Sequence, residues 1–346
     1  MEKLQIIVDD YNKLLFDGME EYFAGIDAEE EELMAPGNIE SIPLIHEAIE
    51  KWNDTVIDEI GTTPREFMAG LETGDVLSCI RMFAEESDFS FPAVLKDRVE
   101  EKKTDLEDFL LCECIDLLRK FSDGEQETTT EEMIVLIEYA GILSSWDCQQ
   151  LLRALLTAFD EIDVSDYIKF ETVSECVESF GRAALPELKD RIVEKVEKLE
   201  KLDAETVDFV REYDYRVNET SSTDDNEHLA ALIKEHRECE EVTGYMLSVM
   251  AYICKNEGIK EDDIYKLLRR AFKAFELRII PTICLVDYGD WRAIALLRST
   301  VEKEGRDMDE AEVREMLVGI INLGGDITGL PGADSLGVSS LDDMKD

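Results

Sequence analysis

The sequence is poor in positive charge. Its 346 residues hold 36 lysines and arginines against 82 aspartates and glutamates, which gives a formal net charge of −46 at pH 7. Lysine and arginine supply most of the affinity for nucleic-acid phosphates and for anionic membrane surfaces, so this composition argues against both kinds of binding. The acid excess predicts solvated helix faces that keep the chain in solution, or an acidic groove that receives a basic partner.

Signals for export and membrane insertion are also missing. The first ten residues, MEKLQIIVDD, have no basic segment followed by a long apolar run, so we expect no signal peptide. No stretch approaches the roughly 18 to 20 apolar residues that a membrane-spanning helix needs. The eight cysteines form no CxxC pair and are scattered among apolar neighbours, which predicts reduced, packed thiols. These features predict a soluble protein of the cytoplasm.

Catalytic signatures are absent from the sequence as well. It holds no GxSxG elbow, no Walker-type phosphate loop and no dinucleotide-binding glycine set, and we expect no cofactor. His228, His236 and Cys239 have a spacing that would place metal ligands on neighbouring helical turns. A clear fourth ligand is lacking, so we expect no metal site there. A non-enzymatic protein is therefore favoured.

A turn rich in acid, from Asp160 to Asp166, superficially resembles a calcium loop. An EF-hand loop requires glycine at its sixth position, and Ser165 stands there instead. We expect Asp163 or Ser165 to cap the helix that follows.

Apolar residues recur at helical spacing along nearly the whole chain. Ile192, Val193, Val196 and Leu199 form one such face, with charged residues between them. The only strand-like run, residues 279–286, contains a proline, which is unsuited to a central strand but suits the first turn of a helix. The pattern predicts an all-α protein.

One helix-opening pattern returns along the chain: a turn, then a proline near the first helical turn, then an amphipathic run. It occurs with proline at Ser41–Trp52, Phe91–Lys102 and Ala184–Lys195, and without proline at Ser144–Phe159 and Tyr288–Lys303. Proline lacks an N–H and has its φ angle preset for the first turn, so it fixes where a helix begins. The unequal spacing predicts an irregular array of helix pairs that bury their apolar faces against one another.

The segment Leu285–Arg298, LVDYGDWRAIALLR, resembles the turn and second helix of a HEAT-like repeat, in which a Gly-Asp turn precedes an Arg-Ala-Ile-Pro-Leu-Leu type of helix. Phe180–Leu188 and Gly37–Ile45 are similar, with Asn38 where aspartate is usual, and Ala295 stands where proline is usual. The resemblance covers about four or five units. It implies an α-α superhelix (solenoid) of stacked antiparallel helix pairs that binds proteins on a curved surface.

Breaks in the pattern predict how the chain is divided. The polar segment 218–226, NETSSTDDN, predicts an exposed linker or long loop between an N-terminal repeat region, 1–217, and a C-terminal HEAT-like region, 227–331. Residues 332–346 are rich in Gly, Ser and Asp, which predicts a disordered tail. A shorter polar break ends at Thr128–Thr130, where we expect a threonine to cap the next helix.

The most unusual local feature is positive. Lys266, Arg269, Arg270 and Lys273 fall along one side of a predicted helix whose other positions are mostly apolar. Either acidic side chains of adjacent repeats neutralise these cations, or they form a docking strip for an anionic partner or for the acidic half of another copy. Three further residues would extend the strip: Arg278, Arg292 and Arg298.

The favoured function is a non-enzymatic protein-binding or scaffold protein that presents an acidic curved surface to a protein partner, which we expect to be basic. The alternative is a metal-dependent enzyme that uses a carboxylate cluster on a helical scaffold. A third hypothesis, in which the acidity imitates nucleic acid, is supported weakly because the charge is scattered. Partner identity and oligomeric state stay open.

Overall fold

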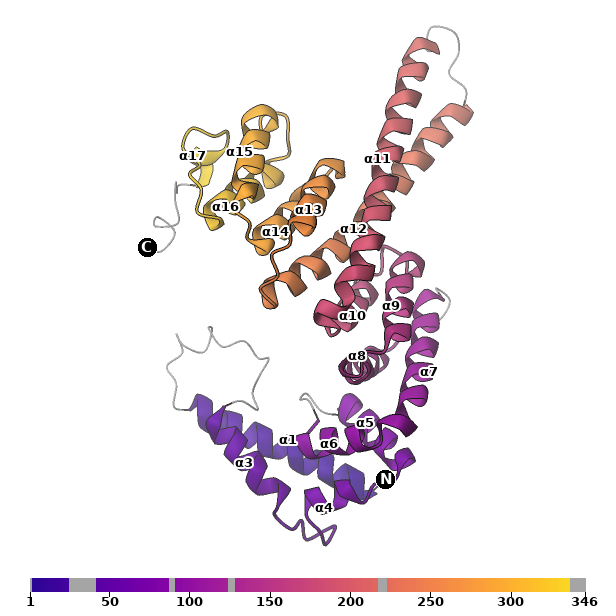
Figure 1. Ribbon diagram of the computed structural model, residues 1–346, viewed down its shortest axis with the longest axis vertical. Coiled ribbons are helices and arrows are strands. Elements are labelled where there is room, and N and C mark those ends of the chain that lie inside the picture. Colours follow the sequence, from indigo (N-terminus) through magenta and orange to yellow (C-terminus); the bar gives the residue numbers. More distant parts are fainter. Residues whose placement is uncertain (1, 25–41, 87–90, 124–127, 217–222, 337–346) are drawn as a thin grey trace. The chain divides into compact units, whose positions relative to one another are not determined.

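The chain is all-helical. The computed structural model describes residues 2–24, 42–86, 91–123, 128–216 and 223–336 (Figure 1). Within these ranges every regular element is a helix, and the extended backbone makes a single isolated bridge between Ile57 and Thr62. The all-α prediction is therefore confirmed. None of the described helices combines the length and the apolar character needed to cross a membrane.

The chain divides into two compact units. Unit 1 comprises residues 1–119 and 127–143, and unit 2 comprises residues 120–126 and 144–346. Unit 1 is built from α1 (Glu2–Phe23), α3 (Pro43–Asn53), α4 (Pro64–Ala69), α5 (Thr73–Glu86), α6 (Ala93–Glu101) and most of α7 (Lys103–Ser122) and α8 (Thr130–Ser145). The remaining helices form unit 2.

An aromatic cluster lies in the core of unit 1. The ring centroid of Tyr11 lies 5.1 Å from that of Trp52 and 5.8 Å from that of Phe83, which joins α1, α3 and α5. All three side chains are buried, and the indole Nε1 of Trp52 donates to Asp10 Oδ2 at 2.8 Å. A buried indole N–H needs such a partner, so the cluster combines apolar burial with a satisfied polar atom.

Four of the described prolines lie at or just before helix beginnings, as the recurring pattern predicts. Pro43 opens α3 and Pro92 immediately precedes α6, and in α4 Pro64 follows Thr63, whose side chain accepts a hydrogen bond from Glu66 N at 3.2 Å. Pro281 lies in the first turn of a helix and not in a strand. Because proline has no N–H to lose there, it can mark each start without breaking a helical hydrogen bond.

The helices of unit 2 pack mainly against their neighbours in sequence. They are α9 (Gln149–Glu161), α10 (Tyr167–Glu178), η2 (Gly181–Ala184), α11 (Leu185–Arg216), α12 (Thr223–Asn256), α13 (Asp262–Ala274), α14 (Ile279–Tyr288), α15 (Arg292–Glu304), α16 (Glu310–Asn322) and α17 (Ala333–Leu336). Successive helices pair as α11 with α12, α13 with α14, and α15 with α16. Further contacts join α11 to α13, α12 to α14, and α14 to α16, and Figure 1 shows these helices in succession.

The polar segment 218–226 lies within unit 2, between two long helices that pack together. Helix α12 begins at Thr223, so the last residues of the predicted loop are helical, and the predicted boundary at 227 falls inside this helix. Residues 217–222 lie outside the described part, as do 337–346 of the predicted disordered tail, while 333–336 form α17.

The structure confirms one helix cap predicted from the sequence and contradicts another. Thr129 caps α8, since its Oγ1 accepts from Glu132 N at 3.3 Å and the Glu132 carboxylate accepts from Thr129 N at 3.1 Å. The cap of α10 is Asp166, whose Oδ1 accepts from Lys169 N at 3.3 Å, so the predicted cap at Asp163 or Ser165 is wrong. Asp163 instead accepts from the backbone N and the hydroxyl of Ser165, which closes the preceding turn.

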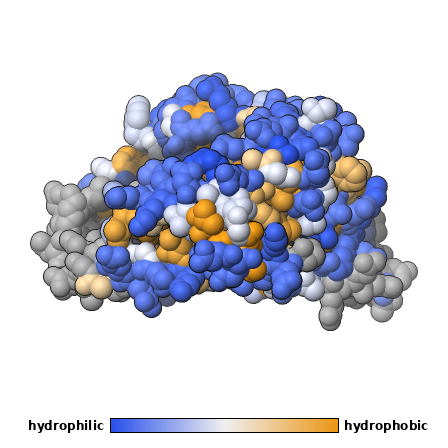
Figure 2. Space-filling view, turned by 90° about the horizontal axis from the view of Figure 1, so that it is seen from below, coloured by the Kyte–Doolittle hydropathy of each residue, from blue (hydrophilic) through white to orange (hydrophobic). Residues whose placement is uncertain are grey.

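Charge is carried almost entirely on the surface. Among the described residues the buried ionisable side chains besides tyrosine and cysteine are Lys169, His236 and Glu312. Most residues on the face drawn in Figure 2 are hydrophilic, and hydrophobic residues gather near its middle. The acid excess of the described part is thus solvated, as the composition predicts.

Asp166 should matter more for stability than its neighbour Asp163. Besides capping α10, its Oδ2 lies 3.1 Å from the ammonium of buried Lys169, whose other partner is the carbonyl oxygen of Phe121. We expect Asp166→Ala to lower the free energy of unfolding by about 2 kcal/mol, because it removes a cap and leaves a buried cation under-paired. Urea unfolding of Asp163→Ala is the control, and an equal or larger loss in the control would contradict the assignment.

Candidate functional site

Helix α13 supplies one wall of a groove in unit 2. Its apolar face is buried and comprises Ile264, Leu267, Leu268, Ala271 and Phe272. Burial of this face forces the intervening cations outward, as the spacing predicts. The charges also suit the helix dipole, because Asp262 and Asp263 lie in the first turn and Lys273 lies in the last.

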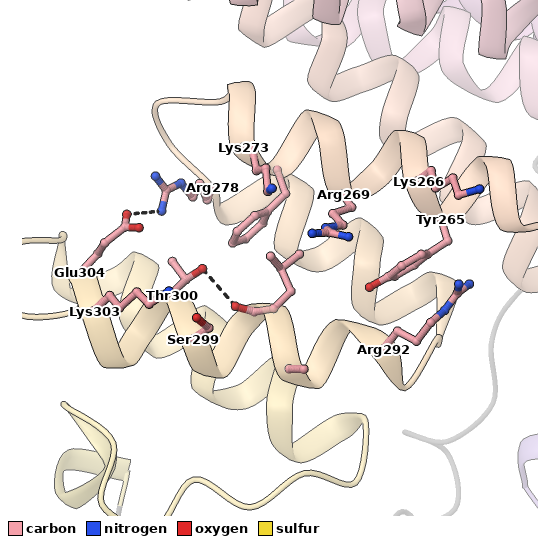
Figure 3. Close-up of a pocket in the computed structure, with 13 residues that line it drawn as sticks. Tyr265, Lys266, Arg269, Lys273, Arg278, Arg292, Ser299, Thr300, Lys303 and Glu304 are labelled. Atoms are coloured by element: carbon pink, nitrogen blue, oxygen red, sulfur yellow. Dashed lines mark hydrogen bonds and ion pairs between the residues drawn. The ribbon is translucent and has the colours of Figure 1, made fainter.

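Helix α15 supplies the opposite wall, and a tight turn positions it. Helix α14 ends at Gly289, which adopts a left-handed conformation with a φ of 67°. Asp290 Oδ1 then accepts from Arg292 N at 2.9 Å, which closes the turn ahead of α15. The turn directs Arg292, Ser299 and Lys303 toward α13 (Figure 3).

The hollow between α13 and α15 has a volume of about 650 Å³, and we call it the cationic groove. Its positive residues are Lys266, Arg269, Lys273, Arg278, Arg292 and Lys303, and its one acidic residue is Glu304. Aromatic and aliphatic side chains complete the lining, among them Tyr265, Phe272 and Leu296. In a chain of net charge −46 this is a local reversal of sign.

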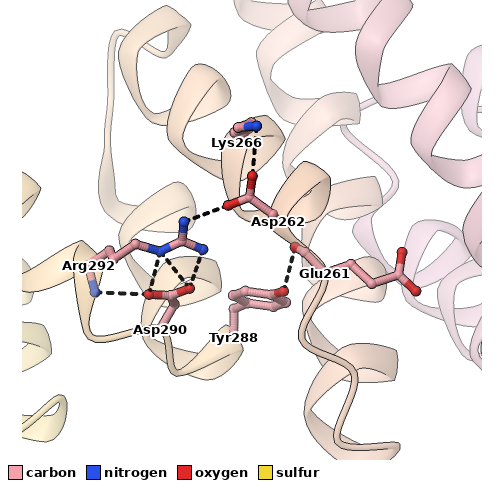
Figure 4. Close-up of polar contacts among 6 residues, drawn as sticks. All are labelled: Glu261, Asp262, Lys266, Tyr288, Asp290 and Arg292. Atoms are coloured by element: carbon pink, nitrogen blue, oxygen red, sulfur yellow. Dashed lines mark hydrogen bonds and ion pairs between the residues drawn. The ribbon is translucent and has the colours of Figure 1, made fainter.

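One end of the cationic groove is neutralised by a network of ion pairs (Figure 4). The Arg292 guanidinium contacts Asp290 through Nη2 at 2.7 Å, binds Asp262 through Nη1, and stacks 4.0 Å from the ring centroid of Tyr265. Lys266 Nζ lies 2.7 Å from the second oxygen of Asp262. Hydrogen bonds from Arg292 and Lys266 lower the pKa of Asp262 to about 2, so this carboxylate stays charged.

The opposite end is closed by Arg278, which follows α13. Its Nη1 lies 2.7 Å from Glu304 Oε2, and its guanidinium carbon lies 5.6 Å from the ring centroid of Phe272. Its backbone N donates to the buried carboxylate of Glu312 at 3.0 Å. The Nε of Arg278 is buried and has no hydrogen-bond partner among the described residues, which leaves a donor at the groove unsatisfied.

The four cations of the predicted docking strip do not share one environment. Lys266, Arg269 and Lys273 line the cationic groove, whereas Arg270 turns to α11 and binds Glu200 through two hydrogen bonds, at 2.8 and 2.6 Å. This bidentate contact raises the pKa of Arg270 and lowers that of Glu200. An adjacent helix thus neutralises one cation, whereas the other three line a groove, and docking of an anionic partner there stays a prediction.

Three groove cations lack an acidic partner. In the part of the chain that the structure describes, no ion pair joins Arg269, Lys273 or Lys303 to a carboxylate, and all three are exposed. Of the predicted extensions of the strip, Arg278 and Arg292 line the groove, while Arg298 lies 3.6 Å from Glu302 on its own helix and does not. The sequence pattern did not single out Lys303, because a periodicity within one helix says nothing about which other helix faces it.

A second hollow in unit 2, of about 890 Å³, lies beside α12 and the α13–α14 connection. Its lining includes Tyr245, Phe275, Leu277 and Ile280, and Leu277 is 58% exposed. Glu240 lies in it and accepts from the backbone N of Leu277 at 2.9 Å, and burial is the main cause that raises its pKa. In the sequence, the strand-like run 279–286 is the signal that indicates this apolar surface, since Ile279 and Ile280 line it.

His236 and Cys239, whose spacing in the sequence suits metal ligands, face different partners in the structure. His236 lies near Glu240 and Glu276, with one ligand atom of each within 4.8 Å of the others, whereas Cys239 Sγ faces the carbonyl oxygen of Lys195. The two oxygens of Glu240 already accept backbone N–H groups of residues 276 and 277, so this cluster joins α12 to the α13–α14 connection.

The buried thiols are unsuited to nucleophilic chemistry. All eight cysteines are free and seven are buried, the exception being Cys112. Burial raises the pKa of Cys79 and of Cys284 to about 12, which keeps both protonated near neutral pH.

Comparisons with protein-family models, with curated proteins and with solved structures found no match for this chain. The cationic groove and the packing of unit 2 are therefore the features of this chain that bear on its function.

Arg270 and Arg269 should respond differently to removal. We expect Arg270→Ala to lower the free energy of unfolding by about 0.5 to 1 kcal/mol, a modest value because solvent screens this half-exposed pair. Arg269→Ala should leave stability unchanged, since no described acid is left unpaired. Urea unfolding measures both, and a loss in Arg269→Ala as large as that in Arg270→Ala would contradict the division of the strip.

Proposed function

We propose that the chain is a non-enzymatic protein-binding scaffold of the cytoplasm whose unit 2 is a run of HEAT-like helix pairs. The contacts of α11 to α16 support this, because each helix packs on its pair partner, and α11, α12 and α14 also pack on the corresponding helices of the next pair, α13, α14 and α16. Nearest-neighbour packing of this kind is what an α-α superhelix requires. Eight free thiols fit a reducing compartment.

The observation that carries the function is the set of three cations without acidic partners in the cationic groove. Arg269, Lys273 and Lys303 lie in a chain with more than twice as many acids as bases, yet no described carboxylate neutralises them. An acidic segment of a partner protein would supply the missing negative charges. Leu296, which lines the groove and is only partly buried, would give the same segment an apolar surface to pack on.

We also propose the predicted basic partner, which would bind the acidic surface outside the groove. Both proposals belong to one scaffold, which presents acid over most of its surface and basic groups at one groove. A partner with separate acidic and basic regions would satisfy both.

The metal-dependent enzyme is the weaker proposal. The group around His236 is the observation that favours it, but Glu240 already accepts two backbone hydrogen bonds. These contacts account for the partly buried carboxylate of Glu240 without an ion.

Binding of acidic peptides tests the favoured function. A fluorescein-labelled octapeptide of alternating Glu and Leu should bind the full chain at 50 mM NaCl, and binding should weaken steeply at 500 mM because salt screens exposed charges. Arg269→Glu combined with Lys303→Glu should reduce the affinity at least about tenfold, as measured by fluorescence anisotropy.

Lys234→Glu is the matched control, because Lys234 is an exposed cation of unit 2 that lies outside the cationic groove. The proposal fails if the peptide does not bind, or if the control variant weakens binding as much as the groove variant.

A further inference from the structure

The unpaired cations of the groove converge from two helices. Arg269 and Lys273 are four residues apart on α13, and Ser299 and Lys303 are four residues apart on α15, so each pair lies on one face of its helix. Both pairs line the cationic groove, and Figure 3 shows Arg269 directed into the space between the two helices. The site thus combines a guanidinium, two ammonium groups and a hydroxyl.

These donors exceed what one carboxylate can satisfy. A guanidinium carries five N–H groups and each ammonium carries three, whereas a carboxylate offers two oxygens and one negative charge. The buried Nε of Arg278 adds a donor that has no described partner. The groove therefore matches an anion with more charge and more acceptor oxygens on one centre.

We propose that the cationic groove binds a segment of a partner protein that carries phosphoserine or phosphothreonine. This rests on the proposed function and names the anion. A phosphoryl group on such a side chain has a charge of about −1.5 to −2 at pH 7 and three strong acceptor oxygens. Arg269 binds the phosphoryl group bidentately, and Lys273 and Lys303 add positive charges from the two walls of the groove.

The overall charge of the chain favours a short ligand over an extended polyanion. Fields from the acidic surface are screened beyond about 8 Å at physiological ionic strength, so a compact dianion inside the groove feels chiefly the nearby cations. A nucleic acid gains affinity by contacting many successive phosphates, which would extend it over the acidic surface and repel it. An anionic vesicle has the same disadvantage.

The dimensions of the groove suit a peptide. From Lys266 to Lys273 helix α13 advances about 10 Å, at 1.5 Å per residue. An extended chain covers that length in about three residues, at roughly 3.3 Å each. Ala295 and Leu296 line the groove beside the cations and are accessible, so they can pack against side chains that flank the phosphorylated residue.

Three labelled peptide pools test the proposal. Each is a nonapeptide pool with degenerate uncharged flanks, and the centre is phosphoserine, serine, or a Glu-Glu pair that approximately matches the phosphoryl charge. Anisotropy with the full chain at 150 mM NaCl should show the phosphoserine pool binding at least about tenfold more tightly than the Glu-Glu pool, and the serine pool not binding. Arg269→Ala combined with Lys303→Ala should weaken the phosphoserine pool at least about tenfold, whereas Lys234→Ala should not change it.

The outcomes separate the two proposals. Equal binding of the phosphoserine and Glu-Glu pools overturns the phosphoryl assignment and leaves the acidic-segment function standing. No binding of either pool overturns both. If inorganic phosphate displaces the labelled peptide at the same concentration as unlabelled phosphopeptide does, the groove is a site for free anions. If a single-stranded oligonucleotide or a phosphatidylserine vesicle binds more tightly than the peptide, the ligand is a different polyanion. Either result overturns the peptide proposal.

Discussion

The burial of one face of α13 is the constraint on which the rest of the site depends. Leu268 and Ala271 have no exposed surface, and Phe272 is 2% exposed, so the helix cannot rotate without bringing apolar area into water. Its cations must then point to the two remaining sides. One side meets α11 and the other meets α15, and these neighbours give the cations different roles.

The neighbours determine whether each positive charge stabilises the fold or stays free to bind. Glu200 on α11 accepts two hydrogen bonds from Arg270, and Asp262 forms ion pairs with Lys266 and Arg292. Helix α15 instead offers Lys303 across the groove and no acid opposite Arg269. Like charges facing each other across a solvent-filled groove are unfavourable, and an anionic ligand relieves that repulsion. A protein with so much acid could have neutralised these cations internally, and the described carboxylates do not.

Local features could be predicted from the sequence, whereas pairings between helices could not. The prolines at the starts of α3 and α14, the left-handed Gly289 and the outward direction of the α13 cations each depend on one segment and its own geometry. Arg270 could not be separated from Arg269 in this way, because adjacent positions differ only in which helix packs beside them. Asp166 is the cap because it directly precedes Tyr167, the first residue of α10, and its carboxylate also contacts the buried Lys169. The second wall of the groove required contacts across about thirty residues of chain, which no periodicity encodes.

The reactivity of individual lysines tests most directly whether the groove cations are unpaired. Lys273 and Lys303 have no described acidic partner, whereas Lys234 and Lys255 are exposed lysines outside the groove, in ion pairs of 3.4 and 2.8 Å. In brief acetylation followed by mass spectrometry, Lys273 and Lys303 should react several-fold faster than the two paired lysines. Inorganic pyrophosphate should slow these two alone, because an anion bound in the groove occupies both amines. Equal rates at all four lysines, or pyrophosphate protection that does not favour Lys273 and Lys303, would contradict the account.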